Sequence, residues 1–147
     1  MEQYRNDKNS IGKHKEAIID LNKAIEINPK DKSAWNNRGS AKNNLGKFNE
    51  AINDLDEAAL CDSEFPNPYA HRAYAYIMLN NFEKAQDDIS KALELKPNYD
   101  RAHFNQGLLY HKQGKLKEAC SSWKKALELG FEEAQEKLDE FCEENEK

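Results

Sequence analysis

Residues 67–100 read NPYAHRAYAYIMLNNFEKAQDDISKALELKPNYD, and this stretch contains the pattern that decides the fold. Two segments with apolar residues at helical spacing are separated by Asn80 and Asn81, a residue type that tolerates the left-handed backbone of a tight turn. The second segment ends before Pro97, which cannot continue a helix interior. The stretch therefore predicts two short helices that fold back on each other as a hairpin.

The same pattern recurs at intervals of 34 residues on both sides of this stretch. Alanine fills two columns, a large apolar residue fills a third, and glycine or alanine fills most of a fourth. In chain order these columns are Ala17, Ala51, Ala85 and Ala119; Ala24, Ala58, Ala92 and Ala126; Leu21, Leu55, Ile89 and Trp123; and Arg5, Gly39, Ala73 and Gly107. Agreement of several columns over four periods without an insertion indicates stacked helical hairpins. We expect the small residues to admit close helix contacts, with Gly39 facing Ala51 and Gly107 facing Ala119.

These columns resemble the tetratricopeptide repeat family, whose 34-residue unit has an aromatic–Gly/Ala–aromatic first helix and an Ala–aromatic–Ala–Pro second helix. The matching stretches are AWNNRG at 34–39, YAHRA at 69–73, FNQG at 104–107, KFNEA at 47–51 and NFEKA at 81–85. The resemblance covers nearly the whole chain. It implies an all-α fold, a right-handed α-solenoid of antiparallel helix hairpins, and a role in binding other proteins.

We expect one domain over residues 1–147, divided along the repeat. The divisions are 1–32, an incomplete first repeat; 33–66, 67–100 and 101–130, the second to fourth repeats; and 131–147, an acidic capping helix. The first repeat is damaged because Arg5 stands where a small residue is needed and His14 replaces an aromatic, so Lys15–Ile27 is the first firm helix expected. Residues after Phe131 carry a single apolar stripe, which suits a helix that covers the end of a repeat array.

Composition narrows the possible partners and compartments. The net charge is −5, and an acidic chain repels phosphate groups, so nucleic acid is not expected as a partner. The acidic residues after 131 are interpreted as a solvated terminal helix rather than a bait for a basic partner. No signal peptide or long apolar run is visible, which favours a cytoplasmic protein without a membrane partner. Three cysteines without a CxxC pair make a disulfide framework unexpected, and Cys120 is interpreted as a packed thiol.

No motif of a catalytic or cofactor site is present. The sequence lacks a P-loop, GxGxxG, HExxH, a nucleophile elbow and an EF-hand loop. The four histidines are scattered, and His103 and His111 are too far apart on one helix to share a metal. We therefore expect a protein that is not an enzyme, with no catalytic residue, no metal ligand and no cofactor.

The first helices of stacked hairpins should line a concave groove, and this groove is the predicted site for a protein or peptide partner. Positions on these helices that packing does not require combine asparagine, histidine and exposed apolar side chains, a mixture that suits a peptide site. Asn37 and Asn105 could bind a peptide backbone through their amides. The predicted groove residues are Asn36, Asn37, Ser40, Asn43, His71, Tyr74, Ile77, Arg101, Phe104, Asn105, Leu108 and His111.

Two more specific functions are weighed against this one. Some family members hold a C-terminal carboxylate with two lysines, two asparagines and one arginine; on the last three repeats only Arg101 keeps a basic character, so binding of chaperone tails is not expected. The alternative function is self-association, because the incomplete first repeat would expose the apolar face of 17–25 to another copy or to an absent domain. A homo-oligomer through the N-terminal end is therefore possible.

Overall fold

The computed structural model describes residues 8–142, and the regular elements in that range are all helices. They are α1 (Lys8–Ile27), α2 (Lys32–Asn44), α3 (Phe48–Cys61), α4 (Pro66–Met78), α5 (Phe82–Leu95), α6 (Asp100–Lys112), α7 (Leu116–Glu128) and α8 (Glu133–Phe141). The all-α fold class is confirmed. What the sequence suggests for residues 1–7 and 143–147 lies outside the described residues.

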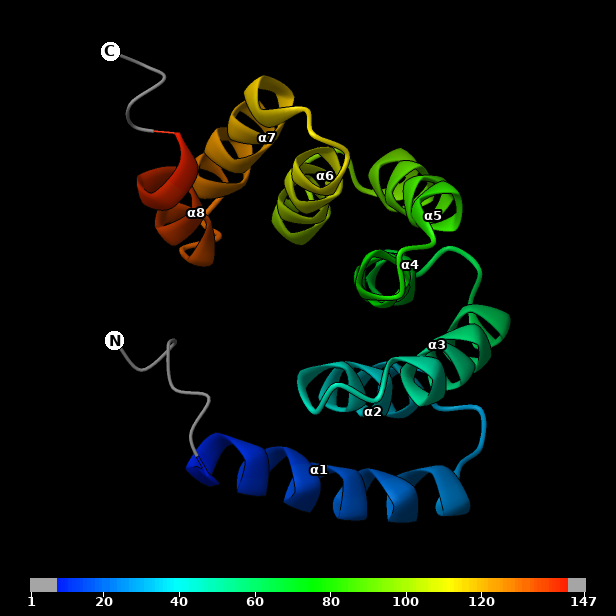
Figure 1. Cartoon of the computed structure of the whole chain (residues 1–147). Coiled ribbons are helices and arrows are strands. Elements are labelled where there is room, and N and C mark those ends of the chain that lie inside the picture. Colours follow the sequence, from blue (N-terminus) through cyan, green and yellow to red (C-terminus); the bar gives the residue numbers. More distant parts are fainter. Residues whose placement is uncertain (1–7, 143–147) are drawn as a thin grey trace.

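The helices form a curved array of hairpins. α2 packs on α3, α4 on α5 and α6 on α7, while α1 packs on α2 and α8 packs on α7. α2 also contacts α4, and α4 contacts α6, so the first helices of successive hairpins touch along the array. Figure 1 shows α2, α4, α6 and α8 on the inner side of the arc, with α3, α5 and α7 on its outer side. This arrangement is a helical solenoid closed by a C-terminal helix.

The turns within the hairpins follow the sequence pattern. Gly46 and Gly114 have φ of 77° and 79°, and Asn80, at the equivalent position, has φ of 63°. The first repeat departs from this pattern because Gly12 lies inside a continuous helix, and α1 begins at Lys8. The expected start of that helix at Lys15 was therefore wrong, since a glycine costs a helix only about 1 kcal/mol and does not by itself create a turn.

The small-residue column makes room for a large side chain rather than for alanine alone. A Cβ added to Gly39 would lie 2.6 Å from Leu55 Cγ, and one added to Gly107 would lie 2.4 Å from Trp123 Cδ1. Ala51 is also a near neighbour of Gly39, as expected, because its carbonyl oxygen lies 3.2 Å from that Cβ position. The pairing that matters is therefore small against large, which lets Leu55 and Trp123 become fully buried.

Buried ion pairs join the helices of the second and third hairpins. Arg72 on α4 donates to both carboxylate oxygens of Asp88 on α5, at 2.8 and 2.7 Å, and its third nitrogen donates to Asp56 on α3 at 2.8 Å. Arg38 makes the equivalent bidentate pair with Asp54, at 2.9 and 2.7 Å. Bidentate guanidinium–carboxylate pairs fix orientation as well as distance, so each arginine sets how its hairpin closes.

A second repeated hydrogen bond fixes each first helix to the loop before it. Trp35 Nε1 donates to the Pro29 carbonyl oxygen at 2.7 Å, and the Tyr69 hydroxyl donates to the Ser63 carbonyl oxygen at 2.8 Å. At the equivalent position, His103 Nε2 lies 3.0 Å from the Pro97 carbonyl oxygen. His103 therefore takes the structural place of the repeat's aromatic residue.

Cys120 on α7 and Cys142, directly after α8, form a disulfide, so the expected packed thiol at Cys120 was wrong. Both cysteines are buried, whereas Cys61 is exposed and free. The sequence signal was weak because the two cysteines lie 22 residues apart in no recognised motif. The bond adds a covalent link between the C-terminal helix and the last hairpin.

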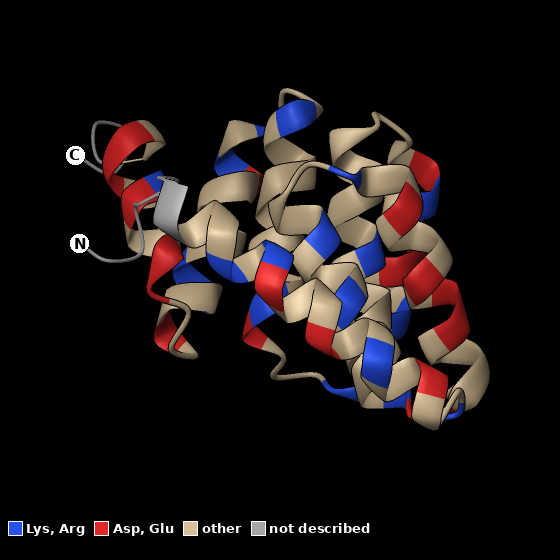
Figure 2. Cartoon of the chain, turned by 90° about the horizontal axis from the view of Figure 1, so that it is seen from below, with Lys and Arg blue, Asp and Glu red and all other residues tan. Residues whose placement is uncertain are grey.

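Acidic side chains gather on the C-terminal helix. Figure 2 shows acidic positions on the helix next to the C-terminal end. The exposed ones among the described residues are Glu132, Glu133, Glu136, Asp139 and Glu140. The opposite face of α8 is apolar, with Ala134 and Leu138 buried against the last hairpin. A solvated acidic face is thus present, although two of its members also border the cavity described next.

Candidate functional site

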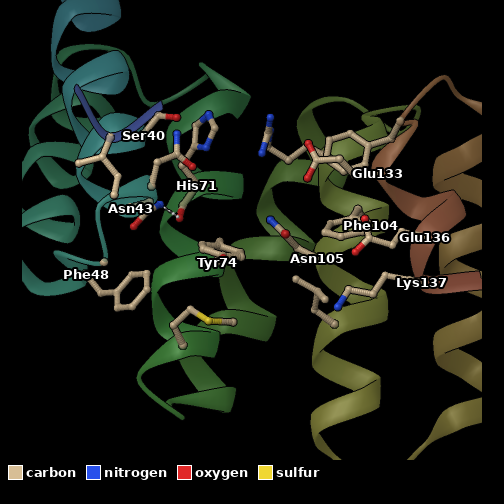
Figure 3. A pocket seen from close by; sticks show the side chains of 17 residues that line it. Ser40, Asn43, Phe48, His71, Tyr74, Phe104, Asn105, Glu133, Glu136 and Lys137 are labelled. Atoms are coloured by element: carbon tan, nitrogen blue, oxygen red, sulfur yellow. Dashed lines mark hydrogen bonds between the residues drawn. The ribbon is translucent and has the colours of Figure 1, made fainter. Parts of the chain in front are cut away.

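A cavity of about 750 Å³ occupies the inner side of the arc. It lies between α2, α4, α6 and α8, and its lining combines aromatic, amide and charged side chains (Figure 3). The residues that line it are Ile11, Ser40, Asn43, Asn44, Gly46, Phe48, His71, Tyr74, Met78, Arg101, Phe104, Asn105, Leu108, Phe131, Glu133, Glu136 and Lys137.

The structure brings most of the predicted groove residues together in this cavity. Those that line it are Ser40, Asn43, His71, Tyr74, Arg101, Phe104, Asn105 and Leu108. They come from α2, α4 and α6, which are the first helices of successive hairpins. Stacking with a regular rotation turns the same face of each first helix inward, which is why sequence spacing alone could select them.

Four of the predicted residues lie elsewhere. Ile77 is fully buried in the apolar core, and Asn36 is only 4% exposed, so neither is available to a partner. Asn37 faces a separate, shallow depression between α1 and α2. His111 packs against the rings of Trp123 and Phe141, with centroids 5.7 and 4.3 Å away. Helix periodicity predicted these four residues in the groove because it does not show which side chains the neighbouring helices cover.

Two asparagines in the cavity wall are already bound within the protein. Asn105 Nδ2 donates to the Ala70 carbonyl oxygen at 2.8 Å, and Asn43 Nδ2 donates to the His71 carbonyl oxygen at 2.9 Å. These bonds link α6 to α4 and α2 to α4. Asn105 is 1% exposed and its amide nitrogen already donates within the protein, so a peptide-binding role of this amide stays a prediction. Asn43 Oδ1 is buried and has no hydrogen-bond partner in the described part of the chain.

Arg101 is the arginine that lines the cavity, and the ion pairs that close the hairpins do not involve it. Within residues 8–142 its guanidinium makes no hydrogen bond or ion pair; it lies over the Phe131 ring, 5.2 Å from the centroid. Arg38 and Arg72, by contrast, are bound to buried carboxylates. A guanidinium held by a ring but otherwise free offers its donors to a ligand.

The local environment sets the protonation of the neighbouring side chains. Burial, with a smaller contribution from the charge of Arg101, lowers the pKa of His71 to about 3. Burial raises the pKa of the Tyr74 hydroxyl, as does the charge of Glu133, while Arg101 acts in the opposite direction. At neutral pH the cavity therefore presents a neutral imidazole and a neutral phenol beside one guanidinium.

The C-terminal helix contributes a wall that sequence analysis missed. Glu133, Glu136 and Lys137 come from α8, and Phe131, just before it, packs on Phe104 with ring centroids 4.7 Å apart. A signal was present in the spacing. The inner helices begin at residues 32, 66 and 100, and α8 begins at 133, where the first helix of a further repeat would start. A helix in that register lines the inner side as well as covering the array.

Among residues 8–142 no three His, Cys, Asp or Glu side chains are grouped as metal ligands would be. No helix in the same range is both long and apolar enough to cross a membrane. The lining of the cavity offers amides, rings and charged groups.

Family models match four stretches of the chain. The model described as TPR repeat matches residues 73–114, and models described as tetratricopeptide repeat match residues 100–130, 21–53 and 9–31. Together they cover 9–53 and 73–130. No curated protein matches the chain by sequence.

Solved structures share the same array. TTC0263, a thermophilic TPR protein of Thermus thermophilus, is 24% identical with a TM-score of 0.75, over 81% of this chain and 67% of that one. MamA is 26% identical with a TM-score of 0.65, over 88% of this chain and 68% of that one. The first TPR of Spaghetti (RPAP3), solved with the HSP90 peptide SRMEEVD, is 26% identical with a TM-score of 0.66, over 79% and 94%. With its 34-residue columns, its helix hairpins and these matches, the chain belongs to the tetratricopeptide repeat family.

Proposed function

We propose that this protein is a non-catalytic scaffold or adaptor that binds a segment of a partner protein in its concave cavity. The observation that carries the proposal is Arg101, whose guanidinium is unpaired within residues 8–142 and lines the same cavity as Tyr74, between four inner helices. The family fold is typically one of protein interaction, and the related RPAP3 domain was solved with a bound peptide. Both support a polypeptide as the ligand.

The lining indicates what such a segment would carry. Tyr74, Met78 and Leu108 offer apolar surface to a side chain, and Arg101 offers charged donors to a carbonyl or carboxylate oxygen. Glu133 and Glu136, which line the cavity from α8, disfavour a strongly acidic segment. We therefore expect an amphipathic segment of mixed charge, with micromolar affinity of roughly −8 kcal/mol.

A chaperone tail remains an unexpected ligand. The positions that would form a carboxylate clamp on the last three repeats are Asn36, Ser40, His71, Arg101 and Asn105. Asn36 is buried, Asn105 is bound to Ala70, and His71 is neutral at physiological pH. One arginine alone does not provide the cluster of cations that two carboxylates require.

The proposal is tested by comparing wild type with Tyr74→Ala and Arg101→Ala as baits for affinity capture from a lysate of the source cells. Phe104 is not a suitable probe because its ring supports Phe131, so its loss would disturb the cavity wall. Lys117→Ala, at an exposed position on α7, serves as the control. Each variant is first shown to match wild type in helicity and thermal stability.

Captured proteins are then divided into overlapping peptides, and binding is measured by fluorescence anisotropy. We expect a peptide that binds wild type and Lys117→Ala equally but binds Tyr74→Ala and Arg101→Ala at least about tenfold more weakly. Peptides that bind all four proteins alike would place the interaction outside the cavity and refute the proposal.

Self-association through the N-terminal end is the alternative function. Its support is that Ile18 and Leu21 of α1 are only partly buried and that Leu21 lines a depression beside α2. It predicts a mass in analytical ultracentrifugation above the 17.0 kDa of one chain, dependent on concentration and lowered by substitution of Ile18 or Leu21. A monomer at all concentrations would remove this alternative.

A further inference from the structure

The face of α1 that carries Ala17 and Leu21 is less covered than the same face of the other outer helices. The equivalents of these two residues are fully buried in every later hairpin: Ala51, Ala85 and Ala119; and Leu55, Ile89 and Trp123. Ala17 and Leu21 are only partly buried, and with Ala41 of α2 they line a depression of about 420 Å³. In each later hairpin this face is covered by the first helix, which α1 lacks among the described residues.

The same face carries a carboxylate without a partner in the described range. Asp20 is equivalent by the 34-residue spacing to Asp54 and Asp88, which are 3% and 5% exposed and bound to arginine. Asp20 is exposed, lines the depression, and makes no ion pair or hydrogen bond within residues 8–142. The chain thus presents one half of its repeated ion pair to solvent.

The second and third hairpins show which residues pair with the aspartate at this position. On the covering helix the arginine is followed directly by a small residue, as in Arg38–Gly39 and Arg72–Ala73. The small residue is required because a Cβ at Gly39 would already lie 2.6 Å from the Leu55 side chain. The chain's own residues 34 positions earlier are Tyr4 and Arg5, which do not have this order.

We propose that this α1 face is a docking site for an amphipathic helix of a partner protein, and that the helix carries arginine followed directly by glycine or alanine. The arginine pairs with Asp20, and the small residue lies against Leu21, as the covering helix does in the second and third hairpins. The interface continues the stack of hairpins, and its charges are complementary. This site is separate from the proposed peptide binding by Arg101 and does not depend on it.

The test uses a helix-stabilised, fluorescent peptide with the sequence of residues 66–79, which contains the Arg72–Ala73 pair, and the full chain. We expect saturable binding by anisotropy, weakened at least about tenfold by Asp20→Arg in the protein. A peptide carrying Arg72→Asp should fail on wild type and recover on Asp20→Arg, because the exchange restores an opposite pair. Asp87→Arg, the same charge change at an exposed position of α5, should bind as wild type does.

Other results would overturn the proposal. If wild type and Asp20→Arg bind the peptide equally, or if the Arg72→Asp peptide does not regain binding to Asp20→Arg, Asp20 does not pair with the arginine of the docked helix. If the full-length protein with Tyr74→Ala fails to bind the peptide while the Asp20→Arg protein still binds it, the peptide binds in the concave cavity instead. A dimer that Asp20→Arg dissociates would assign the face to a second copy. Weaker binding of the peptide to Arg5→Ala would assign the face to the chain's own N-terminal residues, because a small residue at position 5 would let them compete.

Discussion

The second and third hairpins and the fourth hairpin use the same backbone spacing but different means of closure. Arg38 and Arg72 close the earlier two through buried carboxylates. In the fourth, Gln106 stands in the arginine's place and pairs at 3.0 Å with Gln86 of α5, in the preceding hairpin, while the side chain of Trp123 on α7 is fully buried. The repeat therefore fixes where helices meet, whereas either an ion pair or an apolar side chain can hold them there.

The hairpins also differ in whether the arginines of their first helices are held in internal ion pairs. The earlier hairpins bind their first-helix arginines internally, whereas the fourth hairpin bears Arg101, on the inner side, unpaired among the described residues. The largest apolar cluster likewise lies toward the C-terminal end, from Ala73 to Cys142. The C-terminal half thus combines a large apolar core with an arginine that no hairpin ion pair holds, a combination suited to presenting a ligand site on packed helices.

Removal of one partner from a buried ion pair should give the largest effect. Asp88→Ala leaves Arg72 without its bidentate acceptor, and we expect the free energy of unfolding to fall by about 3–5 kcal/mol in urea denaturation. Asp87→Ala, at the exposed neighbour, should change stability by less than about 0.5 kcal/mol. If the two variants are equally stable, the ion pair does not hold the third hairpin.

The C-terminal helix provides the next test, because a covalent bond ties it to the fourth hairpin. Cys142→Ala opens a link between residues 22 apart, and loop-closure entropy predicts a loss of about 3 kcal/mol. Reduction of the wild type should reproduce the loss, and hydrogen exchange should rise first in residues 133–141. Cys61→Ala removes an exposed free thiol and should change neither quantity. Unchanged exchange in α8 after reduction would mean that packing alone holds it.

The fold was predictable because repeat columns report close packing directly. The turns were predicted from Gly46, Asn80 and Gly114. Their positive φ angles follow from the residue types, because glycine and asparagine tolerate the left-handed backbone. The columns did not reveal what each small residue faces, as Gly107 against Trp123 shows. That partner depends on helix rotation, which a spacing of 34 residues does not specify.

The candidate site was predictable in position but less so in chemistry. Periodicity selected the inner faces of α2, α4 and α6, yet it could not show that Asn105 is bound to Ala70 or that Ile77 is buried. The wall from α8 was missed because an acidic terminal helix was interpreted as a cover alone. Contacts between side chains of different helices depend on how the helices pack, which a single sequence does not specify.

The two kinds of packing can be compared with Gly107→Ala and Gly39→Ala, for which we expect smaller losses in the free energy of unfolding. The new methyl group meets the rigid, fully buried ring of Trp123 in the fourth hairpin and the more adaptable Leu55 in the second. After the gain in helix propensity, we expect a net loss of about 1–2 kcal/mol for Gly107→Ala and a smaller loss for Gly39→Ala. Trp123→Leu should reduce the cost of Gly107→Ala in a double-mutant cycle, and additive effects would contradict that contact.

The smallest effect concerns His71, which lies beside the free Arg101. Its pKa in the folded protein is about 3, below the ordinary value of 6.5, so below pH 6.5 the unfolded chain binds a proton that the folded chain does not. The contribution to stability is therefore complete above pH 6.5 and is lost as pH falls toward 3. We expect wild type to lose about 1 kcal/mol more than His71→Gln between pH 7 and pH 5, after allowance for partial exposure. Arg101→Ala should shrink that difference, because burial alone would then hold the imidazole neutral.

A difference that is unchanged by Arg101→Ala would show that the guanidinium does not act on His71, and a difference near zero would show that the imidazole can be protonated in place.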